Sequence, residues 1–160
     1  MSMVVTVCTK DYGLMIVDKR AVSKPTETDE SKFISDSSLK IRTLSNHVCL
    51  GFCGDRDIAA PIAFELPENK DEYLEKCAFL LQEKIKTIVL GEYPVHFLLL
   101  GKLRDGNEYR IITFSSMNEF EPIMHYPEDS VPAHSIALPT LNTVDRERQQ
   151  KTNYRHYFIA

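Results

Sequence analysis

Four residues near the start of the sequence are of types that hydrolytic enzymes use: Ser2, Asp18, Lys40 and Gly54. If Met1 is removed, Ser2 carries both a hydroxyl and a free α-amine. An unperturbed α-amine titrates at about 7.7–8.0, so it can act as the base for the hydroxyl of its own residue. The plainer interpretation is an ordinary serine that follows the initiator methionine.

Asp18 and Lys40 provide a second pair of chemical groups. Residues 39–44 alternate apolar and polar side chains, as a half-buried strand does, and Lys40 falls on the polar side. An ammonium beside a nucleophile at the chain start lowers the pKa of nearby groups. The Asp18 carboxylate can hold this ammonium by a charge-assisted hydrogen bond. The alternative is a structural ion pair at the ends of two strands.

Gly54 is expected at a turn that leads from a strand into a helix. A backbone N–H in that position is suited to bind an oxyanion, and one such donor is worth about 3–4 kcal/mol in the transition state. The next residue, Asp55, adds a carboxylate whose charge opposes the one that must develop on the oxyanion.

Strands are predicted to bring these residues together. Two apolar runs, residues 4–7 and 14–17, flank a polar turn at 10–13 and predict a β-hairpin. The second run is apolar on both faces, which predicts a strand buried between two layers. Residues 39–44 and 47–53 predict a second hairpin, and the polar stretch 23–32 between the hairpins predicts a loop.

The middle of the sequence predicts two helices. Apolar residues recur at helical spacing in residues 58–66 and 74–88, with Asp55 or Asp57 as the first N-cap and Pro67 as the first stop. Further strands are predicted at 95–101, 109–114, 121–126 and 134–138, and the last 20 residues read as a surface helix or tail. This order predicts one α+β domain, residues 1–160, with a helical layer on a sheet.

Composition excludes several classes of function. The 160 residues carry a net charge of −4, so there is no basic footprint for nucleic acid. No apolar run approaches the ~18 residues of a membrane span, and no secretion signal is recognisable at the start. We therefore expect a cytoplasmic protein that binds neither nucleic acid nor membranes.

Cysteine and histidine spacing gives no sign of a metal or cofactor. The four cysteines show no CxxC pattern and are expected to be reduced core residues. They are Cys8, Cys49, Cys53 and Cys77. The five histidines have no triad or metal-ligand spacing, and we assign them no role.

Four segments together resemble the proteasome-type N-terminal-nucleophile (Ntn) hydrolases, a family that includes proteasome β-subunits and the bacterial peptidase HslV. Residues 2–7, Ser-Met-Val-Val-Thr-Val, resemble the family's opening Thr-Thr-Ile-Val-Ala-Val, and residues 18–21 match its Asp-x-Arg-Ala. Residues 39–42 resemble its lysine-bearing strand, and 51–55 resemble its Gly-Phe-Ala-Gly-Gly. Residues 63–66, Ala-Phe-Glu-Leu, continue the likeness, and the order and spacing of the segments over residues 2–66 make the resemblance specific.

The resemblance implies an αββα sandwich of antiparallel sheets with helices on the outside, truncated at the C-terminus. It implies a peptidase or amidase that uses Ser2 after Met1 removal, with catalytic roles for Asp18, Lys40 and Gly54 and no cofactor. It also implies a homo-oligomer with a peptide or amide substrate. The nucleophile is serine where the family has threonine, and residues 138–143 replace the family's Gly-Ser-Gly turn.

Substrate-binding residues are also implied by the resemblance: Arg20, Ala21 and Phe52. A phenylalanine at the third of these positions would narrow the specificity pocket toward small side chains. Two other functions stay open. One is a non-catalytic proteasome-like subunit with a structural or regulatory role, and the other is a small-molecule binding module built around Phe52 and Lys40.

Overall fold

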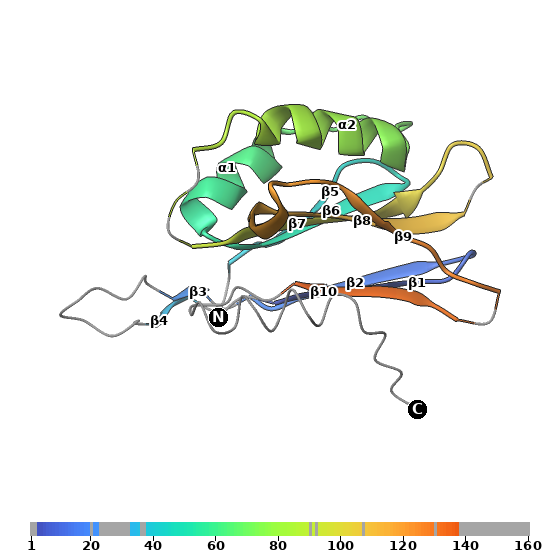
Figure 1. Cartoon of the computed structure of the whole chain (residues 1–160), viewed down its shortest axis with the longest axis horizontal. Coiled ribbons are helices and arrows are strands. Elements are labelled where there is room, and N and C mark those ends of the chain that lie inside the picture. Colours follow the sequence, from blue (N-terminus) through green and yellow to red (C-terminus); the bar gives the residue numbers. More distant parts are fainter. Residues whose placement is uncertain are drawn as a thin grey trace.

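The protein has an α+β fold, as predicted, and its described strands form antiparallel sheets. The computed structural model describes residues 3–19, 21–22, 33–35, 38–89, 91, 93–106, 108–129 and 131–137. Figure 1 shows two helices lying on a five-stranded sheet, with a three-stranded sheet beneath it. A short two-stranded pairing, β3–β4, lies to one side. Within the described ranges, neither helix is long and apolar enough to span a bilayer.

The elements follow one another in the order that the sequence predicts, with one added hairpin. The strands before the helices are β1 (Val4–Cys8), β2 (Gly13–Val17), β3 (Ala21–Val22), β4 (Phe33–Ser35), β5 (Ile41–Thr43) and β6 (Val48–Gly54). The helices are α1 (Arg56–Glu65) and α2 (Leu74–Ile85). The remaining elements are β7 (Val95–Lys102), β8 (Tyr109–Ser115), the 3₁₀ helix η1 (Ser116–Asn118), β9 (Ile123–His125) and β10 (Ala133–Ala137).

The first strand is the central strand of the three-stranded sheet, whose order is β10-β1-β2. Its inward residues Val4, Thr6 and Cys8 are fully buried, so β1 is a core strand. The prediction that β2 is buried on both faces is wrong, because Leu14 and Ile16 are each 53% exposed. Successive side chains of a strand point to opposite faces, and only one face of this sheet packs on the other sheet.

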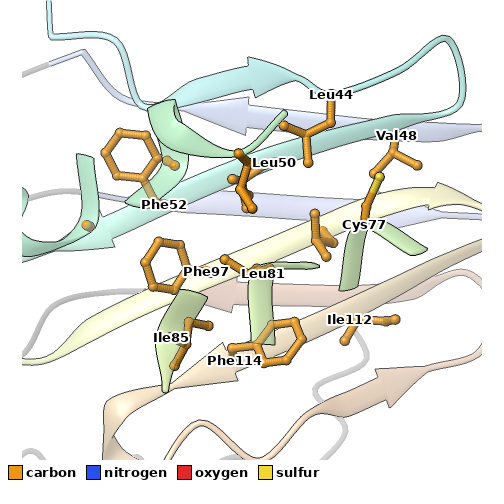
Figure 2. Close-up of a cluster of buried hydrophobic side chains, with 14 of the residues drawn as sticks. Leu44, Val48, Leu50, Phe52, Cys77, Leu81, Ile85, Phe97, Ile112 and Phe114 are labelled. Carbon is orange, nitrogen blue, oxygen red and sulfur yellow. The ribbon is translucent and has the colours of Figure 1, made fainter. Parts of the chain in front are cut away.

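The five-stranded sheet, in the order β5-β6-β7-β8-β9, carries the helices. The Asp55 carboxylate accepts the Asp57 N–H at 3.1 Å and caps α1, as expected of an N-cap aspartate. Helix α2 buries one residue per turn, Leu74, Cys77, Leu81 and Ile85, at the predicted spacing. Figure 2 shows side chains of this helix packed against Leu50, Phe97 and other residues of the sheet.

Several boundaries differ from the predicted ones. The two predicted hairpins exist, but they belong to different sheets, β1–β2 to one and β5–β6 to the other. Strand β5 is only three residues long, so Lys40 precedes it. The loop predicted at 23–32 lies outside the described residues, as do residues 138–160. All four cysteines are free thiols, as predicted.

Candidate functional site

Asp18 and Lys40 form a short ion pair that links the two sheets. Lys40 Nζ lies 2.5 Å from Asp18 Oδ1, and the lysine side chain is only 6% exposed while the aspartate side chain is 30% exposed. Asp18 directly follows β2 of the three-stranded sheet, and Lys40 directly precedes β5 of the five-stranded sheet. The contact that the sequence predicted between these two side chains is therefore present where the sheets meet.

The same carboxylate also holds the start of the chain. Asp18 Oδ1 accepts the Met3 N–H at 3.1 Å, and the Asp18 N–H donates to the Met3 carbonyl at 3.1 Å. Ser2 itself lies outside the described residues. A peptide bond joins it to the Met3 nitrogen. Residue 2 is thus attached directly to an atom that contacts the ion pair.

Gly54 lies on the strand next to Lys40 and has a conformation that requires glycine. Its φ is +102°, and a β-carbon at this position would lie 1.9 Å from the Pro94 carbonyl oxygen. The Phe52 N–H donates to the Lys40 carbonyl at 3.0 Å, and the Asp55 N–H donates to Pro94 on the opposite side. Because N–H groups alternate in direction along a strand, the Gly54 N–H is directed to the Lys40 side of β6.

Of the three residues predicted to bind substrate, Phe52 is the one whose side chain the structure describes. Phe52 packs in the core between the helices and the five-stranded sheet, where its ring meets the Phe64 ring of α1 edge-on at 6.0 Å. The Phe52 side chain is 2% exposed in this cluster, and its role in substrate binding stays a prediction. Arg20 lies outside the described residues, and Ala21 is described only through the backbone of β3.

Cys53 and His96 are two polar residues near the ion pair, and both face the layer between the sheets. Burial raises the pKa of the Cys53 thiol to about 12, Lys40 lowers it and Asp18 raises it, so the thiol lies within the electrostatic reach of both charges. At this pKa the thiol is protonated near neutral pH and is no nucleophile. His96 pairs with Cys53 across β6 and β7, and burial lowers its pKa from 6.5 to about 4.

Two polar groups at this end of the sheets were missed by the sequence analysis. Ser38 Oγ and His96 Nε2 are buried and have no hydrogen-bond partner within the described chain. The alternation of residues 38–40 could have indicated Ser38, since Ser38 and Lys40 are buried on either side of the exposed Leu39. Nothing local could have indicated His96, because it meets Cys53 only through the register of β6 and β7.

Neither a metal centre nor a known relative adds to this arrangement. No group of three or more histidine, cysteine or acidic side chains suited to hold a metal occurs among the residues that the structure describes. Comparisons with models of known protein families and with curated protein sequences returned no match.

Proposed function

We propose that this protein is a proteasome-like hydrolase of the Ntn type, a peptidase or amidase whose nucleophile is Ser2 after removal of Met1. One observation supports it above the others: a single atom, Asp18 Oδ1, contacts both the Lys40 ammonium and the Met3 N–H. The Met3 nitrogen, to which residue 2 is bonded, thereby shares its acceptor with a buried ammonium. A terminal nucleophile needs a positive charge near it, and the Lys40 ammonium would supply this charge to a free hydroxyl and α-amine at residue 2.

In the proposed reaction, the Ser2 α-amine takes the proton of the Ser2 hydroxyl as the oxygen attacks the substrate's amide carbon. The Lys40 ammonium and the Gly54 N–H stabilise the negative charge on the tetrahedral oxygen. Collapse breaks the C–N bond, and the leaving amine takes the proton from the α-ammonium. Water then attacks the resulting ester by the same route, which releases the acid and restores the hydroxyl.

The wider proposal includes the αββα architecture of the family, a cytoplasmic location, a homo-oligomer and a peptide or amide substrate. The helix–sheet–sheet layering and the ion pair at the end of both sheets support it. Asp55, whose charge would oppose an oxyanion, has one carboxylate oxygen engaged in capping α1. This hydrogen bond gives the Asp55 carboxylate a structural role in the helix.

The test begins with the intact mass of the purified protein, which should lack one methionine. Hydrolysis of a panel of blocked tripeptidyl aminomethylcoumarin amides should then be detectable and should fall at least 100-fold in Ser2→Ala. Thr43→Ala removes an exposed hydroxyl from β5 and is the matched control that should keep full activity. Retained Met1, or Ser2→Ala with unchanged hydrolysis, would contradict the proposal.

A second candidate, a non-catalytic subunit of an assembly, is favoured by exposed aromatic side chains on both helices. Phe64 on α1 and Phe79 on α2 are 45% and 54% exposed. Light scattering would test it: Phe79→Lys should shift a defined oligomer toward monomer. An oligomer that lacks hydrolysis and keeps Met1 would favour this second function over the first.

A further inference from the structure

We propose that Asp105 is a site of spontaneous modification, where the side-chain carboxyl condenses with the Gly106 backbone nitrogen and reopens as isoaspartate. Both residues lie in the exposed turn between β7 and β8. Asp105 is the one aspartate that a glycine follows in the sequence, and no asparagine precedes a glycine. The proposal concerns the chain itself and does not rest on the proposed function.

Gly106 offers an unhindered nitrogen for this reaction. Its φ is +116°, a conformation that residues with a side chain rarely adopt. A β-carbon at this position would meet no heavy atom within 4 Å apart from the neighbours in the chain. Among the described residues, no backbone carbonyl accepts the Gly106 N–H. The nitrogen is therefore neither shielded by a side chain nor held by a backbone hydrogen bond.

The Asp105 carboxylate is also available, unlike other aspartates of this protein. The Asp18 carboxylate is held by the Lys40 ammonium, and the Asp55 carboxylate caps α1. Asp105 is exposed, and no hydrogen bond or ion pair joins its side chain to another residue that the structure describes. Nothing in the described fold therefore keeps the carboxyl away from the neighbouring nitrogen.

The reaction needs only the chain and water. The Gly106 nitrogen attacks the side-chain carbonyl carbon of Asp105, and the new C–N bond closes a succinimide ring. The carboxyl hydroxyl leaves with the amide proton as water. Water then adds to the ring carbonyl that came from the main chain and breaks its C–N bond. The main chain now runs through the β-carbon of residue 105, the α-carboxylate is free, and no oxidant or cofactor has taken part.

The turn is fixed at its base and not at its tip. The Leu103 N–H donates to the Glu108 carbonyl at 2.9 Å, and the Arg104 N–H donates to the Glu75 carboxylate of α2 at 3.2 Å. Both contacts lie outside the reacting pair, so ring closure breaks no hydrogen bond of the described residues. Exposed loop tips open at little cost in free energy. The folded protein should therefore react nearly as fast as an unfolded peptide.

Ageing of the full-length protein in neutral buffer tests the proposal. Isoaspartate is counted by methylation with an isoaspartyl methyltransferase and S-adenosylmethionine, and it is located by peptide mapping with the endoproteinase Asp-N, which does not cleave before isoaspartate. It should form at residue 105 at no less than about one-tenth of the rate in a synthetic peptide of residues 102–109. A lower rate would mean that the fold holds the turn closed and would overturn the proposal.

Two controls separate this site from general ageing of the chain. Asp11 is an exposed aspartate between β1 and β2, but Tyr12 follows it, so it should stay unmodified over the same period. Asp105→Glu should abolish methylation, because the added methylene would require a larger ring, and should leave the melting temperature unchanged at this exposed position. Methylation that persists in Asp105→Glu, or that maps equally to Asp11, would overturn the proposal.

Discussion

The two faces of the five-stranded sheet are packed in different ways. The face under the helices belongs to one continuous apolar cluster, in which Phe97 and Leu99 of β7 meet residues of α1 and α2. The opposite face, toward β1, β2 and β10, is divided between two smaller clusters around Leu98 and Leu100. Three of the four cysteines, the buried Thr6 and His96 lie in or beside this second layer.

The difference shows where this fold tolerates polar groups. Amphipathic helices supply only apolar side chains to their shared layer, so that layer stabilises the fold without supplying chemistry. The layer between the sheets ends at the Asp18–Lys40 pair, and its polar groups lie along strands that lead to that pair. Two of these polar side chains find carbonyl partners on strands: Thr6 Oγ1 donates to the Ser135 carbonyl of β10, and Cys8 Sγ donates to the Tyr109 carbonyl of β8 in the other sheet.

The largest effect is expected on the helix side. Phe97→Ala removes a fully buried ring from the continuous cluster and should lower the free energy of unfolding by about 3–5 kcal/mol. Urea denaturation followed by circular dichroism measures this. A loss below 1 kcal/mol would mean that the helical layer contributes little to stability. The two faces of the sheet would then not differ in the way described above.

At the end of the other layer, Asp18→Asn should lower the free energy of unfolding by about 3 kcal/mol. It removes the carboxylate from an almost completely buried ammonium. Lys40→Met should cost less, because the carboxylate that it leaves is 30% exposed and can be hydrated. Comparing the two variants by urea denaturation checks this order, and the reverse order would show that the pair is not held mainly by the need to neutralise Lys40.

Acid should weaken the layer between the sheets through His96. Burial lowers the pKa of His96 from 6.5 to about 4, so between these values the unfolded chain binds the proton that the folded chain does not. Stability is therefore complete above pH 6.5 and falls as the pH drops toward 4, by up to about 3 kcal/mol at about 1.4 kcal/mol per pKa unit. The difference between wild type and His96→Asn should vary with pH in this window only, and a constant difference would contradict the assignment.

The smallest effect is expected on the outer face of the three-stranded sheet. Ile16→Thr changes a side chain that is 53% exposed, so the free energy of unfolding should change by no more than about 0.5 kcal/mol. Thermal denaturation measures this. A loss of 2 kcal/mol or more would show that this face is covered in solution.

The local features of the fold could be predicted from the sequence because they depend on neighbours in the chain. The periods of α1 and α2, the Asp55 cap and the order of the strands all follow from short-range spacing. The two-residue strand β3 and the three-residue strand β4 have no such signal, and their pairing was missed. Which face of β2 is buried depends on the packing of one sheet on the other, so Leu14 and Ile16 were misjudged.

In the candidate site too, features set by local spacing could be predicted, and features set by sheet packing could not. The contact between Asp18 and Lys40 could be predicted because each residue ends or begins a recognisable strand. The burial of Phe52 under the helices could not be predicted, because a strand's alternation does not tell which face the helices will cover. His96 was missed for a related reason, since its neighbour Cys53 is 43 positions away and is brought to it only by strand register.

The central position of β1 has a consequence for the order of folding. One edge of this strand pairs with β2, but the other pairs with β10, so that Thr6 and Ser135 meet across 129 positions of sequence. Closing so long a loop is entropically unfavourable and slow compared with forming hairpins or helices. During synthesis, β1 must therefore wait for β10 before it is paired on both edges.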